Sequence, residues 1–218
     1  MRTSENPEAT FLAIMTASAT HEVRNVLAII KESAGLIEDL MWSCRNKGVL
    51  DEEKVSRTVD RIDTQVKRGA ELLTNLNRLS HTLDQDLATV DLNEEIHLLA
   101  FLCQRLARKN GCQISAEPGA QEVKATVHPL RLHMALFTAM ECCLDRFPEG
   151  VSVTLRAVDH GGRPSVDVVG ISSEPLHPPD IRLAEDWGNL SRLLDTLNAV
   201  AEPSAAGAGF RILFQPVG

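Results

Sequence analysis

A chain of 218 residues with 30 acidic and 22 basic side chains carries a formal net charge of −8, and no cluster of Lys and Arg could neutralise a row of phosphates. Its 44% hydrophobic and 24% charged residues predict a folded protein. No run of about eighteen apolar residues predicts a membrane helix, and the N-terminal segment MRTSENPEAT is polar. We therefore expect a cytoplasmic protein with no nucleic-acid or membrane partner.

The first part of the chain has the pattern of a long amphipathic helix. Its apolar stripe consists of Leu12, Met15, Ala19, Val23, Val26, Ile30, Ile37 and Leu40. We expect this helix to begin near Pro7 and to end near Arg45. Ser4 or Asn6 can supply its N-cap, and Gly48 the left-handed residue that stops it.

A second long helix follows a short loop, with Asp51 as its N-cap. Its stripe consists of Val55, Val59, Ile62, Val66, Ala70, Leu73, Leu76, Leu79, Leu83 and Leu87. The short loop predicts an antiparallel hairpin. Because one hairpin leaves apolar surface in water, we expect a homodimer in which two hairpins form a four-helix bundle. The alternative is a hairpin that packs on the second domain of its own chain.

Residues 89–218 alternate between helical and strand patterns. Asp91 or Asn93 can cap a third helix, and further helices are expected at 129–147 and near 190–200. Strands are expected at 112–116, 123–127, 151–158, 165–169 and 210–214. This order predicts an α/β sandwich with helices on one face of a sheet. The chain is thus predicted to be α+β, with a helical hairpin at 1–88 and a second domain at 89–218.

A histidine at the centre of the first helix faces away from its apolar stripe. At about 100° per residue, His21 lies roughly 200° from Ala19 and from Val23. Asn25, four residues on, shares its face. An outward His on a helix is by itself an ordinary solvated side chain, so the surrounding motif decides how it is interpreted.

The segment HEVRNVL (21–27) resembles the phosphoacceptor helix of two-component histidine kinases, in which His-Glu-x-x-Asn or His-Glu-x-x-Thr precedes a Leu. Val26 stands where the family commonly has Pro. The resemblance implies that His21 is the phosphoacceptor and that Glu22, Arg24 and Asn25 form the rest of the site. Glu22 is expected to accept a hydrogen bond from the imidazole, and Asn25 to orient the phosphoryl group or a hydrolytic water.

The second domain resembles the ATP-binding domain of the same kinases in segments 90–96, 128–150 and 207–214. The resemblance places Thr138 and Cys142 where active kinases carry Asn side chains, one of which binds Mg²⁺. Neither side chain suits that ion. Gly170 stands where an Asp would bind the adenine amino group, and the Gly-rich lid is reduced to residues 187–190. We therefore expect a degenerate domain that binds no nucleotide or metal.

These features predict a histidine phosphotransferase that moves phosphoryl groups between His21 and receiver-domain aspartates of response regulators without ATP. The receiver would bring the Mg²⁺, and an upstream hybrid kinase is a further expected partner. Two alternatives stay open: an ATP-dependent histidine kinase with a divergent nucleotide site, and a non-catalytic pseudokinase adaptor that binds a response regulator. The remaining histidines are expected to be structural or solvated. They are His81, His97, His128, His133, His160 and His177.

The five cysteines do not form a metal-binding or redox pattern. They are Cys44, Cys103, Cys112, Cys142 and Cys143. No pair has C-x-x-C spacing, and no histidine lies at zinc-ligand spacing from them. We expect reduced, mostly buried thiols.

Overall fold

The computed structural model describes residues 6–109, 111–117, 119, 121–148, 150–172, 180–204 and 208–215. The helices are α1 (Pro7–Lys47), α2 (Glu52–His81), α3 (Leu92–Lys109), α4 (Pro129–Arg146) and α5 (Trp187–Thr196), with 3-10 turns η1 (Thr82–Asp84) and η2 (Ile181–Leu183). The strands are β1 (Ala88–Asp91), β2 (Ile114–Glu117), β3 (Lys124–Val127), β4 (Ser152–Asp159), β5 (Pro164–Ile171), β6 (Val200–Pro203) and β7 (Ala208–Leu213). The chain is α+β, as the sequence predicts.

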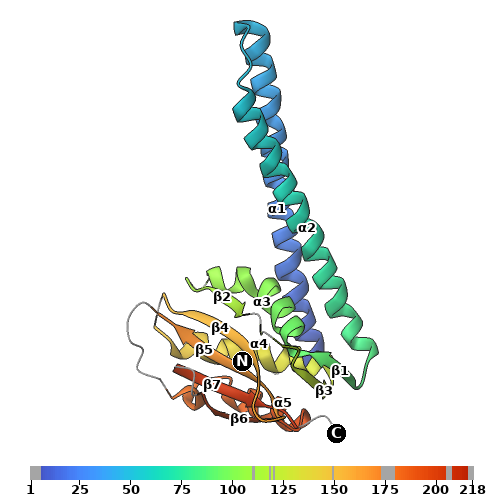
Figure 1. Cartoon of the computed structure of the whole chain (residues 1–218), viewed down its shortest axis with the longest axis vertical. Coiled ribbons are helices and arrows are strands. Elements are labelled where there is room, and N and C mark those ends of the chain that lie inside the picture. Colours follow the sequence, from blue (N-terminus) through green and yellow to red (C-terminus); the bar gives the residue numbers. More distant parts are fainter. Residues whose placement is uncertain are drawn as a thin grey trace.

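Figure 1 shows a long antiparallel hairpin of α1 and α2 that projects from the α/β region, which comprises β1 to β7 with α3, α4 and α5. The base of the hairpin packs on α3 and α4. The ring of Phe11 in α1 lies 5.6 Å from that of Phe137 in α4, between centroids. None of the helices that the structure describes combines the length and hydrophobicity needed to cross a membrane.

Local capping chemistry explains where the hairpin helices begin. The Asn6 side chain accepts a hydrogen bond from the backbone N–H of Ala9 at 3.0 Å, so the prediction of Asn6 as N-cap is confirmed. Gly48 ends α1 with φ 75° and donates its N–H to the carbonyl of Cys44. Asp51 caps α2 by accepting from the N–H of Lys54 at 3.0 Å.

The second helix ends earlier than the sequence predicts. Its apolar stripe was expected to reach Leu87, but α2 ends at His81. The Thr82 hydroxyl donates to the carbonyl of Leu79 at 2.7 Å and the chain tightens into η1. Leu83 and Leu87 are consequently exposed, by 53% and 68%. The prediction was wrong here because the following residues pair as β1 with β3 instead of continuing the helix.

A heptad-spaced seam joins the two long helices. The α2 side chains that are buried or half-buried in it are Val55, Thr58, Ile62, Gln65, Leu72, Leu76 and Leu79, with Gly69 at the same spacing. A Cβ at Gly69 would lie 3.2 Å from Val26, so this glycine lets α2 approach α1 closely. Val59, Val66 and Leu73 also belong to the predicted stripe, but they face outward with 49%, 53% and 57% of their surface exposed.

The strands form two sheets. Strands β2, β4, β5, β7 and β6 lie side by side in that order, with β2 parallel to β4 and the other neighbours antiparallel. Strands β1 and β3 form a separate antiparallel pair. The hairpin of β4 and β5 is confirmed. Strands β1 and β6 were not predicted, since the first ends at a residue interpreted as a helix cap, Asp91, and the second contains Pro203.

One face of the five-stranded sheet carries a row of alternating charges. Glu117, Arg156, Asp167, Arg211 and Glu202 are successive register partners on β2, β4, β5, β7 and β6. Arg211 binds the buried Asp167 through both a 2.7 Å and a 2.9 Å hydrogen bond, and Arg156 binds Glu117. The alternate residues on the opposite face belong to the hydrophobic core, and α3 and α4 contact that sheet.

Candidate functional site

His21 lies on the exposed side of α1, as its spacing predicts. Ala19 is buried and Val23 half-buried on the other side, where α1 meets the rest of the molecule. Arg24 is also exposed, and so is Leu27, by 59%. A protein partner can therefore reach the imidazole without a change in the hairpin.

Asn25 contacts both His21 and Glu22. Its Nδ2 atom lies 3.3 Å from Nδ1 of His21 and 3.3 Å from Oε1 of Glu22. An amide N–H that points at Nδ1 makes this ring nitrogen the acceptor, which places the imidazole proton on Nε2. Asn25 is thus positioned to select the tautomer of His21, and turning its amide group would select the other tautomer.

Glu22 is buried in the α1–α2 seam, with 7% of its surface exposed. Its Oε2 atom accepts hydrogen bonds from Arg68 of α2 at 2.7 Å and from Arg108 of α3 at 2.9 Å. We expected Glu22 to accept a hydrogen bond from the imidazole of His21, but the described side chains form no such bond. Two guanidinium groups are the stronger partners for a carboxylate.

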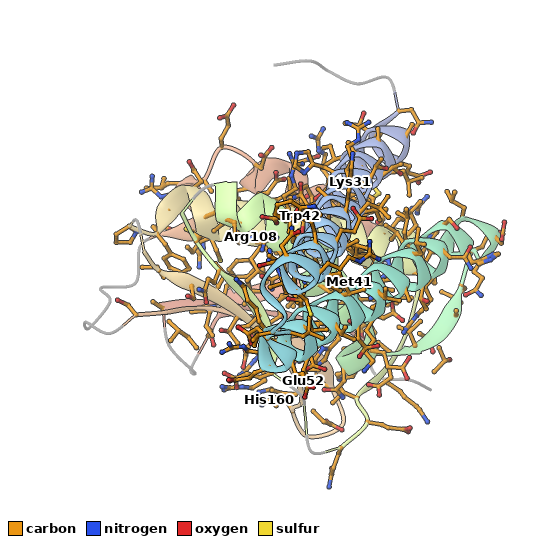
Figure 2. All side chains as sticks on the ribbon, turned by 90° about the horizontal axis from the view of Figure 1, so that it is seen from above. Lys31, Met41, Trp42, Glu52, Arg108 and His160 are labelled. Carbon is orange, nitrogen blue, oxygen red and sulfur yellow. The ribbon has the colours of Figure 1, made fainter. Side chains whose placement is uncertain are left out.

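A cavity of about 580 Å³ opens next to this ion cluster, between the hairpin and α3. Its polar lining consists of Glu22, Asn25, Gln65, Arg68, Arg105 and Arg108, and its apolar lining of Val26, Ala28 and Ile29. Figure 2, seen from above the hairpin, shows Arg108 beside the hairpin helices. The sequence did not predict this basic cavity, because its arginines come from two helices far apart in the chain.

The three positions that the resemblance assigns to nucleotide and Mg²⁺ binding are not arranged as an open site. Thr138 and Cys142 lie one turn apart on α4 and are 5% and 0% exposed. Burial, with the carboxylates of Asp186, Glu141 and Asp145 nearby, raises the pKa of the Cys142 thiol to about 12. A protonated, buried thiol is a poor ligand for Mg²⁺.

The space in front of Gly170 is filled by an aromatic ring. A Cβ built on Gly170 would lie 2.8 Å from both Cε2 and Cζ of Phe147 and 3.1 Å from Cγ1 of Val151. A longer side chain at this position would collide with that ring. A carboxylate side chain at this position, where the resemblance would place an adenine-binding Asp, therefore has no room in this arrangement.

Acidic side chains surround the end of α4. Glu141 lies at the rim of a cavity of about 160 Å³ whose other lining residues are mostly apolar. Glu141 is exposed to solvent as a residue, but its mostly apolar neighbours partly desolvate the carboxylate. This desolvation, together with the charge of Asp186, raises the pKa of Glu141 to about 7. Within the described part of the chain, no three His, Cys, Asp or Glu residues are grouped as metal ligands.

The segment 187–190, which the sequence suggested as a shortened lid, forms the first turn of α5. The rings of Trp187 and Phe210 of β7 pack edge to face, with centroids 5.6 Å apart. Leu190 is fully buried. Trp187 and Leu190 therefore pack in the core of the α/β region, whereas Gly188 and Asn189 are exposed.

A second polar cluster joins the hairpin to the α/β region. Nε2 of the fully buried His133 in α4 lies 2.7 Å from Glu95 of α3, whose other oxygen accepts from Arg78 of α2 at 2.8 Å. Burial raises the pKa of Glu95, but the hydrogen bonds and charges of His133 and Arg78 outweigh it and lower the pKa overall. His133 is thus structural, as expected.

Of the other histidines, His81, His97 and His160 are exposed and His128 is half-buried. His177 lies outside the described residues. Of the cysteines, Cys103, Cys112, Cys142 and Cys143 are buried and Cys44 is half-buried, and none of the five forms a disulfide with a described residue.

No family model matches the chain, and no curated protein matches it. Among solved structures, the catalytic domain of histidine kinase ThkA is similar at 16% identity and a TM-score of 0.48, over 61% of this chain and 98% of that one. Acinetobacter baumannii histidine kinase AdeS is similar at 12% identity and a TM-score of 0.47, over 91% and 98%. ThkA in complex with response regulator protein TrrA is similar at 18% identity and a TM-score of 0.44, over 94% and 61%. These values describe a distant likeness in arrangement.

Proposed function

We propose that this chain is a cytoplasmic histidine phosphotransferase of a two-component phosphorelay. In this proposal, residues 1–88 form the phosphotransfer and dimerisation hairpin, and residues 89–218 form a scaffold that helps to dock response-regulator receiver domains. The observation that carries the proposal is the position of His21, which is exposed on α1 with Asn25 in contact with its Nδ1 atom.

The transfer step needs a lone pair on Nε2 of His21. This nitrogen attacks the phosphorus atom of a receiver aspartyl phosphate, and the N–P bond forms as the P–O bond to the aspartate breaks. The aspartate leaves as a carboxylate, and the proton stays on Nδ1. Asn25 must then present its amide oxygen to Nδ1–H, which requires the amide to turn from the geometry described above. The receiver would supply the Mg²⁺, whose charge would neutralise the phosphoryl oxygens.

Several features support a phosphoryl source other than ATP. The ring of Phe147 fills the space in front of Gly170. Thr138 and Cys142 are buried. Glu141, Asp145 and Asp186 place negative charge beside Cys142, where it would repel a triphosphate. All these features oppose purine and phosphate binding at this site.

The outer face of α2 supports the homodimer. Val59, Val66 and Leu73 are spaced by seven residues, so they lie on one side of the helix, and each is about half exposed. An apolar stripe of this kind is stabilised by packing against a second copy. A four-helix bundle formed through this face would bury the three side chains.

The decisive experiment mixes the purified protein with a phosphorylated receiver domain in the absence of ATP and follows the label. We expect transfer to the wild-type protein and loss of transfer in His21→Ala and His21→Gln. His160→Ala is the matched control, because His160 is exposed in the turn between β4 and β5. Binding of the receiver without any transfer would overturn the proposal and favour the adaptor.

A second candidate is an ATP-dependent histidine kinase with a divergent nucleotide site. The similar solved structures bear the name histidine kinase, and that name suits this candidate at least as well as a phosphotransferase. It predicts that the purified protein labels His21 from ATP and that Mg-ATP raises its melting temperature. A parallel reaction with labelled ATP and no receiver therefore separates the two candidates.

A further inference from the structure

We propose that the cavity between the hairpin and α3 is a binding site for a phosphate-type oxyanion, held by Arg105 and Arg108 of α3 with Arg68 of α2. The cavity has a volume of about 580 Å³, which is ample for a tetrahedral anion with several waters. The three arginines and Asn25 place hydrogen-bond donors along its wall.

The charge of the lining favours an anion. Three guanidinium groups face one carboxylate, that of Glu22, which already binds Arg68 and Arg108. Arg105 is half-buried and makes no hydrogen bond or ion pair with any described residue. The lining therefore keeps a net positive charge and one guanidinium fork that no described residue binds. Such a fork matches the oxygens of a phosphate group.

The placement of the arginines fits a single ligand. Arg105 and Arg108 are three residues apart on α3, so both project from the same side of the helix. Val26, Ala28 and Ile29 of α1 form the apolar part of the lining. Apolar side chains lower the local dielectric constant and strengthen the attraction between guanidinium and anion.

The cavity is linked to the proposed phosphoacceptor through Asn25, since its lining residues include Asn25 but not His21. Asn25 lines it and contacts Nδ1 of His21. The oxyanion could therefore come from two sources, free inorganic phosphate or the phosphoryl group carried by His21. The second source rests on the proposed function, whereas the first does not.

The first experiment titrates the unphosphorylated chain of 218 residues with inorganic phosphate at constant ionic strength and follows the heat of binding. We expect saturable binding that Arg105→Gln weakens about tenfold, since it removes one charge-assisted interaction. Arg105 forms no bond with the part of the chain that the structure describes, so this variant should keep the melting temperature of the wild-type protein. Arg163→Gln is the control, because Arg163 is an exposed arginine in the turn between β4 and β5.

The second experiment phosphorylates His21 with phosphoramidate and measures the half-life of the phosphohistidine. A shorter half-life in Arg105→Gln than in Arg163→Gln, with no binding of free phosphate, would assign the site to the covalently held group. Binding of free phosphate that depends on Arg105 would assign it to the free anion, whatever the outcome of phosphorylation. If Arg105→Gln matches the wild-type protein in both measurements, the oxyanion site does not exist.

Discussion

The guanidinium of Arg108 in α3 donates to the carboxylate of Glu22 in α1 at 2.9 Å, across 86 positions of sequence. Glu22 directly follows His21, and Arg68 of α2 binds the same oxygen atom at 2.7 Å. One carboxylate therefore joins both helices of the hairpin to the α/β region next to the proposed phosphoacceptor. A change in this ion cluster should alter stability as well as the surroundings of His21.

We predict that Glu22→Gln lowers the free energy of unfolding by about 1–2 kcal/mol. The carboxylate side chain is only 9% exposed, but those of Arg68 and Arg108 are 38% and 51% exposed and can be solvated again, which limits the loss. Urea unfolding measures the effect. Glu32→Gln is the matched control, since the Glu32–Arg61 pair lies on the hairpin surface with side chains 71% and 49% exposed. Glu32→Gln should lower the free energy of unfolding by less than about 0.5 kcal/mol. Equal losses in the two variants would contradict the prediction.

We predict that Glu141→Gln stabilises the protein at pH 8 by about 1 kcal/mol, a value reduced for the partial exposure of this side chain. The pKa of Glu141 is raised to about 7 in the folded state, so the folded state holds this proton more tightly than the unfolded state does. The charged carboxylate therefore costs stability above pH 7, and that cost disappears as the pH falls toward the ordinary pKa of 4.5. Thermal unfolding of both proteins at pH 8 and near pH 4.5 measures the difference.

The control for this pH dependence is Asp195→Asn, since Asp195 is an exposed carboxylate on α5. Its melting curve should follow that of the wild-type protein at both pH values. An equal stabilisation by Glu141→Gln at both pH values would show that the gain comes from packing and not from the proton.

The order of helices and strands was largely predictable from periodicity and caps. The side chains of Asn6 and Asp51 cap the beginnings of α1 and α2, and the left-handed backbone of Gly48 ends α1. The end of α2 was not predictable from its apolar stripe, because Leu83 and Leu87 continue the helical spacing. The chain leaves the helix at His81, and the residues that follow pair as β1 with β3. Strand β1 was missed because Asp91 and Asn93 in and after it were interpreted as caps of the next helix, and β6 because it contains Pro203.

The candidate site was predictable only where it is local. The outward direction of His21 and its closeness to Asn25 follow from helical spacing along one segment. The partners of Glu22 do not, because Arg68 and Arg108 lie on other helices. The ring of Phe147 in front of Gly170 likewise depends on how the end of α4 packs against β5, which no local pattern shows.

We predict that the wild-type protein is a dimer in solution and that Val66→Glu converts it to a monomer. Val66 is 53% exposed on the outer face of α2, between Val59 and Leu73, and a carboxylate there could not be buried between two hairpins without a large desolvation cost. Light scattering coupled to size exclusion measures the mass. Val49→Glu, in the loop at the far end of the hairpin, is the control and should leave the dimer intact. A monomeric wild-type protein would contradict the prediction.

We predict that Gly170→Ala lowers the free energy of unfolding by about 1–3 kcal/mol through overpacking. The added Cβ would lie 2.8 Å from two ring carbons of Phe147, and it also meets Val151 at 3.1 Å, so the ring has to move. If the ring is the cause, the same substitution should cost clearly less in a Phe147→Leu background, where the smaller side chain leaves space. Urea unfolding of the four proteins gives the coupling energy between the two positions. Additive effects, with no coupling beyond about 0.5 kcal/mol, would mean that Phe147 does not restrict position 170. That result would weaken the proposal that residues 89–218 do not bind ATP.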